Sequence, residues 1–290
     1  MTIKKEKFKL KWLMLFLLVF IPSITFSEVF VEPYVGYNSF QKLGSLMNVI
    51  DNYSYFSFPP VTFSEIKGGW DFGGKLGIQV TKQNNVFLTG KISYLSATTG
   101  MRYLQLRDTA INQGDLDWFI GYPDNFKVSL LTGQVGLRIT PYQSKKATIG
   151  FDVSGGPATS KITIDGTGQY FNGTSSFTYT FNTPYKKASS VFEIAANFEI
   201  RPFSASDNKP DELSSGELFP VQETTLVISI GSRIANIGNV KLTRNIDLNS
   251  DGVIDLEKGT TLKNTYINAG DNLKLNLTSL FLNVGVNVKF

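Results

Sequence analysis

The sequence predicts an all-β protein: a closed, antiparallel, up-and-down transmembrane β-barrel. Eight segments alternate apolar and polar residues with a period of two, as strands with one apolar face do. The connections between these segments are alternately long and mostly short, which is typical of barrels in outer membranes. Charged residues make up only 18% of the chain, below the usual quarter, as expected for a protein that water does not surround on all sides.

Residues 1–27 have the features of a secretion signal. A basic segment with five lysines precedes an apolar run at 12–21, and the small residues Thr25 and Ser27 stand where a signal peptidase reads the chain. The apolar run is shorter than the ~18–20 residues that a spanning helix needs, although an uncleaved anchor is the alternative. We expect the mature protein to begin near Glu28, outside the cytoplasm.

The net charge of +4 comes from this leader. It holds five Lys and one Glu, so 28 − 5 = 23 bases and 24 − 1 = 23 acids remain in residues 28–290. The mature chain is therefore neutral as a whole, and the basic pI gives no reason to expect nucleic acid as a partner.

The alternation is clearest at the C-terminus, where 279–290 reads SLFLNVGVNVKF. One face is apolar and ends on Phe290, and the other carries Ser, Asn, Gly and Lys. Each segment is near the ~9–11 residues that a tilted membrane strand requires. The predicted strands are 29–37, 69–81, 86–96, 127–140, 147–155, 190–201, 224–238 and 279–290.

Four long connections and three shorter ones join these strands. The even strand number places both termini on the side of the shorter turns, which would be periplasmic. Within the third long connection, residues 163–181 could add a ninth and a tenth strand. The predicted surface loops are 38–68, 97–126, 156–189 and 239–272, and the predicted turns are 82–85, 141–146 and 202–222.

A secreted β-sandwich is the alternative fold, since its strands also alternate. The presumed inner faces favour the barrel because they carry five acids and five bases, which could pair in a narrow interior where unpaired charges are costly. Trp70, Tyr94, Tyr142 and Phe290 fall near strand ends, as membrane-interface aromatics do. The predicted interior charges are Glu32, Asp71, Lys75, Lys91, Arg138, Asp152, Glu193, Glu199, Arg233 and Lys289.

Residues 28–290 resemble the OmpA/OmpX-type small outer-membrane barrels, most strongly in the final strand that ends VGVNVKF. The resemblance implies that Val286, Val288 and Phe290 belong to an assembly signal read by the outer-membrane insertion machinery. It also implies outer-membrane lipid as a partner and the bacterial outer membrane as the location. The chain departs from the smallest family members in its longer loops and in a 21-residue third turn.

The composition limits the possible chemistry. Without Cys or His, the chain has no thiol nucleophile, no disulfide and no His-dependent active site. The family's lipid-modifying and proteolytic members rely on a His, so we expect no enzyme. The acid pairs Asp115/Asp117 and Glu193/Glu199 are conceivable acid–base partners, but a solvated loop and an interior ion-pair network explain them more simply.

The long loops suggest a role in recognition. Segments 53–60 and 115–126 place aromatics among Gly, Asn, Asp and Ser, a composition of adaptable contact surfaces; they could equally pack on each other and close the barrel mouth. Host matrix, a phage and lipopolysaccharide are all compatible as the partner of these loops. The alternative function is a narrow channel or carrier for small molecules, because glycines at 73, 77, 136, 150, 231 and 285 could leave space inside an eight-stranded barrel.

The fourth loop predicts a weak Ca²⁺ site. Residues 247–255 read DLNSDGVID, and oxygen ligands at alternate positions around a turn glycine are the pattern of EF-hand and dockerin-type loops, which this segment resembles. Position 12 of that pattern is Lys258 rather than an acid, and a plain Asp/Asn/Gly-rich turn is the alternative. The predicted ligands are Asp247, Asn249, Asp251, the Val253 carbonyl and Asp255.

Overall fold

The computed structural model describes most of residues 28–290. The predicted signal segment 1–27 lies outside the described residues. Within the described part, no helix is long and apolar enough to cross a membrane. The described residues are 28–40, 66–81, 85–100, 106–107, 117–172, 176–201, 223–247, 252, 254, 257–261 and 274–290.

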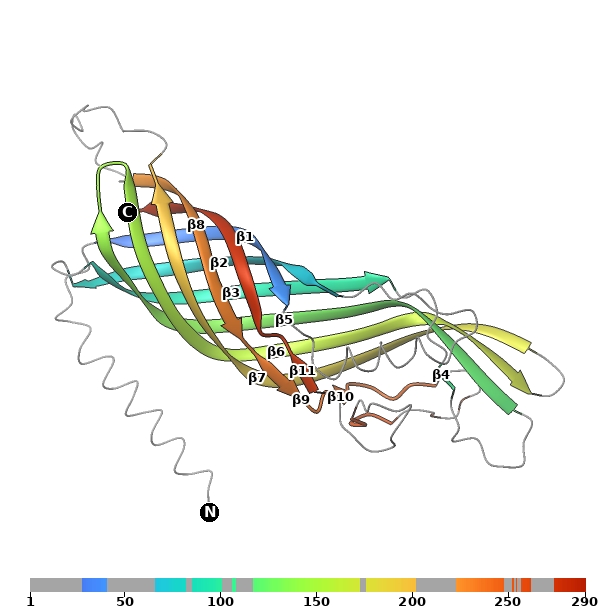
Figure 1. Ribbon diagram of the computed structural model, residues 1–290. Coiled ribbons are helices and arrows are strands. Elements are labelled where there is room, and N and C mark those ends of the chain that lie inside the picture. The colour runs from blue at the N-terminus through green and yellow to red at the C-terminus, as the bar shows by residue number, and fades with distance from the viewer. Residues whose placement is uncertain are drawn as a thin grey trace, which may run out of the picture.

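Eight antiparallel strands form a closed barrel (Figure 1), as the sequence predicts. Each strand pairs with the next, and the circle closes because the last strand pairs with the first. A β-sandwich, whose sheets have open edges, is thereby excluded, and the barrel has eight strands rather than ten. The strands are β1 (Val29–Phe40), β2 (Gly68–Thr81), β3 (Val86–Gly100), β5 (Asp117–Gln143), β6 (Ala147–Asn172), β7 (Ser176–Ile200), β8 (Glu223–Ile234) and β12 (Ser279–Lys289).

The two ends of the barrel differ. The first described residues, the C-terminus and the β5–β6 turn lie at one end, which we call the turn end; the opposite end is the loop end. At the turn end Phe290 donates its N–H to the Val29 carbonyl at 2.8 Å, which extends the β12–β1 pairing to the last residue.

The alternation along the strands separates an apolar outside from a polar inside. Along β12, Leu280, Leu282, Val284 and Val286 are exposed while the residues between them are buried. Trp70, Tyr94 and Tyr142 also point outward, and Trp70 meets the Tyr37 ring edge-on at 5.7 Å. An exposed apolar belt around a closed barrel is the surface that lipid covers.

Strands β5, β6 and β7 extend far beyond this belt (Figure 1), which corrects the predicted loops. Segment 156–189 is strand except at 173–175, which lies outside the described residues, and part of 97–126 belongs to β5. Residues 163–181 lengthen β6 and β7 rather than forming a ninth and a tenth barrel strand. The prediction stopped each strand at membrane length, whereas the β-branched and aromatic residues of these segments continue to pair outside it.

Four short strands accompany the barrel at its loop end. β4 (Leu106–Arg107) pairs with β5, and β10 (Lys241–Leu242) pairs with β7. β9 (Asn236–Gly238) pairs with β11 (Lys274–Asn276). The β9–β11 pairs keep the register of the β8–β12 pairs, and β10 pairs with β7 beyond the point where β8 ends, so the chain after β8 continues outward along the barrel wall.

Candidate functional site: the barrel interior and its loop end

The ten charged residues predicted for the interior are all buried there. They come from all eight barrel strands, and they lie at alternate positions because every second residue of a barrel strand points inward. Their partners divide them into two clusters along the barrel axis. We call these the turn-end cluster (Glu32, Lys75, Arg138, Asp152, Glu199, Lys289) and the loop-end cluster (Asp71, Lys91, Gln134, Glu193, Arg233).

Arg138 on β5 is the centre of the turn-end cluster. Its Nη2 donates to Glu32 Oε2 at 2.7 Å, and its Nε donates to Asp152 Oδ1 at 2.8 Å. Lys75, which lies on β2, forms ion pairs with the same two acids. The Arg138 guanidinium also lies 4.6 Å from the centre of the Phe30 ring. Each charge thus has an opposite charge in the low-dielectric interior, which offsets the loss of water.

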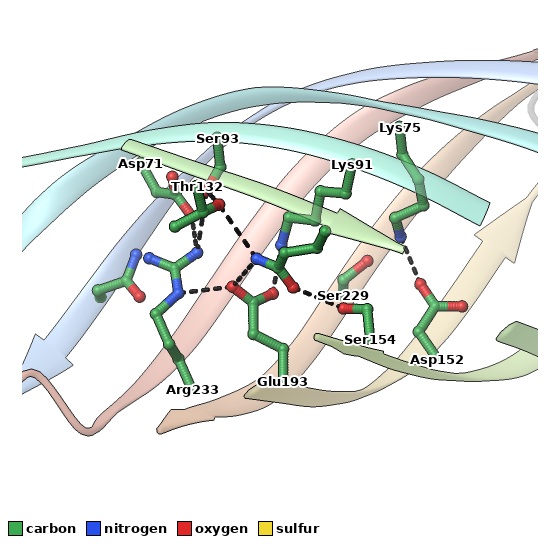
Figure 2. Close-up of polar contacts among 12 residues, drawn as sticks. Asp71, Lys75, Lys91, Ser93, Thr132, Asp152, Ser154, Glu193, Ser229 and Arg233 are labelled. Atoms are coloured by element: carbon green, nitrogen blue, oxygen red, sulfur yellow. Dashed lines mark hydrogen bonds and ion pairs between the residues drawn. The ribbon is translucent and has the colours of Figure 1, made fainter. Parts of the chain in front are cut away.

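Arg233 on β8 is the centre of the loop-end cluster, which Figure 2 shows. It donates to Asp71 Oδ2 at 2.7 Å and to Glu193 Oε1 at 2.6 Å. Lys91 pairs with the other Glu193 oxygen. Gln134 donates to Glu193 at 2.8 Å and accepts from Ser154 at 2.7 Å, which links Glu193 to β6.

Side chains leave little space between the two clusters. An interior cavity of about 20 Å³ is lined by Tyr34, Lys91 and Asn283 among others, and a second of about 10 Å³ lies near Glu199 and Lys289. Such volumes suit roughly one water molecule each. Glycines do not open a path: a Cβ at Gly77 would lie 2.0 Å from the Phe30 ring, and one at Gly73 would lie 2.4 Å from the Tyr34 hydroxyl.

Above the loop-end cluster the inward face changes from charged to apolar. Leu95, Val128, Leu130 and Ile162 continue the inward faces of β3, β5 and β6, and they are almost completely buried. They pack against apolar residues of the chain that continues beyond β8 and of the segment that leads into β12. We call the residues contributed by these two segments the plug: Ala235, Ile237, Val240, Leu242, Ile246 and Leu277.

Backbone and side-chain contacts hold the plug in place. Leu277 donates its N–H to the Ala235 carbonyl at 2.9 Å, and Leu242 lies opposite Tyr185 in the β10–β7 pair. Burial in this apolar environment raises the pKa of Tyr185 to about 12, because the phenolate would lose its hydration there. The plug closes the loop end of the barrel, and the two polar clusters fill the space behind it.

The acid pairs considered for catalysis are not arranged as partners. Glu193 and Glu199 belong to different clusters, where Arg233 and Lys91 neutralise the first and Arg138 and Lys289 face the second. Asp115 lies outside the described residues, as does the side chain of Asp117. The interior thus offers paired carboxylates rather than a free acid and base.

The predicted Ca²⁺ loop is described only in part. Asp247 accepts a hydrogen bond from the Gly252 N–H at 2.8 Å, and Gly252 has a φ of +90°. This bond joins the first and the sixth positions of the predicted loop. Asn249, Asp251, Val253 and Asp255 lie outside the described residues.

Sequence reasoning missed two features of the loop end. The plug residues follow β8 without a break in hydrophobicity, so they were included in a strand or a loop. The other feature is a set of outward-facing lysines on β6, β7 and β10, which only the strand register brings together. No signal within any one segment reveals this second feature.

No family model and no curated protein sequence matches the chain. Among solved structures, Ail, the attachment invasion locus protein of Yersinia pestis, is similar at 9% identity and a TM-score of 0.30, with 91% of this chain and 97% of that chain covered. Ail in complex with the heparin analogue sucrose octasulfate gives 8% identity, a TM-score of 0.32 and the same coverage. The outer membrane protease OmpT from Escherichia coli gives 8% identity and a TM-score of 0.38 over 92% of this chain and 98% of that chain. At these identities the likeness concerns the barrel fold alone.

Proposed function

We propose that this protein is a non-catalytic barrel of the bacterial outer membrane that displays a rigid β-sheet on the cell surface for contact with a partner. The observation that carries the proposal is the extension of β5, β6 and β7 beyond the apolar belt. We call its outermost part, 117–123 with 166–172 and 176–181, the platform; there the three strands remain paired. An anchor alone does not need strands of 25–27 residues, since ~9–11 residues span the membrane.

The interior supports an anchoring and display role over a transport role. Two ion-pair clusters fill most of the barrel interior around the small cavities, and the apolar side chains of the plug fill its loop end. A carrier would need a path for its substrate, and the interior side chains and the plug occupy that space. The chain also lacks the His and Cys on which most acid–base and nucleophilic mechanisms depend.

A second part of the proposal concerns the segment after β10. We infer that Ca²⁺ binds at residues 247–255 and stiffens this part of the loop-end surface. The Asp247–Gly252 hydrogen bond and the positive φ of Gly252 support the inference. A tight turn at the glycine lets the oxygens of alternate loop residues point toward one ion.

A shortened hairpin tests whether the platform serves display rather than assembly. Gly166 lies opposite Phe181, so deletion of 167–180 with insertion of Asn-Gly should give a tight hairpin. We expect the shortened and the full-length proteins to reach the outer membrane in similar amounts and to show the same heat-modifiable mobility on gels. Failure of the shortened barrel to assemble would make the platform a folding element, and recovery of the full-length protein in a soluble fraction would refute the membrane barrel.

A further inference from the structure

Three lysines form a row across neighbouring strands on the outer face of the barrel. Lys161 on β6 lies directly opposite Lys186 on β7, and Lys186 lies directly opposite Lys241 on β10. All three side chains are exposed, and directly opposed residues share one face of the sheet with their Cβ atoms ~5 Å apart. We call these residues the lysine row. Lys127 on β5 is also exposed, and it pairs with Thr163, two residues from Lys161.

The lysine row is electrostatically unfavourable by itself. Like charges directly opposite each other destabilise a sheet. None of the three lysines forms an ion pair within the described part of the chain. Among the described acids of this region, Asp165 accepts a hydrogen bond from Asn182, and Glu257 is exposed without a described ion pair. An external anion would neutralise the row.

The height of the row above the apolar belt indicates where that anion comes from. Two outward-facing residues, Pro157 on β6 and Leu131 on β5, serve as reference points for the loop-end edge of the belt. Lys161 lies four residues beyond Pro157, and Lys127 lies four residues beyond Leu131. Four residues of a strand tilted by ~40° rise roughly 10 Å. That is the level of the headgroups, which lie outside a hydrocarbon layer of ~30 Å, and lysine side chains can bend toward it.

We propose that the lysine row binds the phosphate groups of anionic lipid headgroups in the outer leaflet around the barrel. Several phosphates at one level suit a row of ammonium groups spaced by the sheet, each of which is a mobile point charge with three donors. The lipid would then neutralise the repulsion between the lysines and fix the barrel's depth below the platform. This inference rests on the proposed membrane location.

Nanodiscs test the proposal on the purified full-length barrel. We would measure its unfolding midpoint in phosphatidylcholine alone and with increasing fractions of lipid A, which carries two phosphates. The wild type should gain stability as lipid A is added. Because each lysine near a charged surface contributes about 1 kcal/mol, Lys161→Gln/Lys186→Gln should need about 10- to 30-fold more lipid A for half the effect. The matched control is Lys145→Gln/Lys146→Gln, which removes two exposed lysines at the turn end.

Further arms separate the sources of anion and the effect on folding. In phosphatidylcholine alone, Lys186→Glu should raise the unfolding midpoint, because an acid then stands between two lysines, and it should abolish the response to lipid A. A response to lipid A that is equal in the row variant and in the turn-end control would overturn the proposal. A lysine-dependent response to inorganic phosphate or heparin without one to lipid A would overturn the assignment to lipid. A heat-modifiable band from each nanodisc sample shows that the barrel itself is intact, so a failed response to lipid A is distinguishable from a failed barrel.

Discussion

Arg233 and Asp71 face each other across the loop-end half of the barrel, 162 residues apart in the sequence, with Arg233 Nη2 donating to Asp71 Oδ2 at 2.7 Å. Neither side chain is reached by solvent. Removing one member of a buried pair leaves the other charge uncompensated in a low dielectric, which costs more than the pair contributes when intact. This pair therefore makes the interior sensitive to single substitutions.

Asp71→Leu should lower the free energy of unfolding by about 3–5 kcal/mol, because Arg233 would lose one of the two acids that it pairs with. Unfolding in urea from lipid vesicles, followed by tryptophan fluorescence, measures the change. Glu257→Gln removes an exposed acid and should stay within about 0.5 kcal/mol of the wild type. Equal effects of the two substitutions would mean that the interior pair is open to water.

The terminal residue should be needed for assembly. Phe290 closes the backbone pairing between β12 and β1, and an unpaired edge inside a membrane is costly. Deletion of Phe290 should reduce the amount in the outer membrane several-fold while secretion continues, whereas Phe290→Tyr should retain most of it. Gels of membrane fractions with and without heating give the result. Unchanged heat-modifiable protein after the deletion would show that the terminal aromatic has no role in assembly.

Calcium should protect the segment after β10 from proteolysis. Without an acid at the twelfth position, we expect a dissociation constant on the order of 10⁻⁴–10⁻³ M. Limited proteolysis with millimolar Ca²⁺ or with chelator, read by mass spectrometry, compares the wild type with Asp247→Ala/Asp251→Ala. Only the wild type should be protected, and cleavage that is the same in all four samples would leave an ordinary turn.

Alkaline pH should lower the free energy of unfolding through ionisation of Tyr185, which packs against the plug. Its pKa in the folded protein is about 12, against about 10 in an unfolded chain, so the unfolded state releases the proton first. The stabilisation from the neutral phenol is therefore complete below pH 10 and is lost as pH rises toward 12, by on the order of 2 kcal/mol. The difference in unfolding free energy between wild type and Tyr185→Phe, measured from pH 9 to 12, isolates this contribution. A difference that does not change with pH would place the hydroxyl in water.

The fold could be predicted because successive residues of a barrel strand alternate between its lipid-facing and its interior side. In β12 five outward apolar residues alternate with inward residues that are mostly small or polar, and this period identifies both the strand and its lipid-facing side. The extents of β5, β6 and β7 could not be predicted in the same way. Membrane thickness limits the apolar belt, but it does not limit how far strands continue to pair outside it.

The partners inside the barrel depend on register, which composition does not reveal. Arg138 meets Glu32 over 106 residues of sequence, and Lys161 meets Lys186 only because β6 and β7 are longer than a membrane strand. The alternation predicts that a residue such as Arg138 faces inward, but it does not say which inward acid lies at the same height. The plug was missed for a related reason: its apolar residues have the composition of another strand, and only the pairing beyond β8 places them in the barrel mouth.

Surface labelling tests the central claim, that the platform projects from the cell while the short turns face the periplasm. The chain has no cysteine, so Thr180→Cys on β7 and Lys145→Cys in the β5–β6 turn each introduce one exposed thiol at a described position. With a membrane-impermeant maleimide on intact bacteria, we expect labelling of the Thr180→Cys variant, and labelling of the Lys145→Cys variant only after the outer membrane is permeabilised. Labelling of the Lys145→Cys variant alone in intact cells, or of neither variant under any condition, would contradict it.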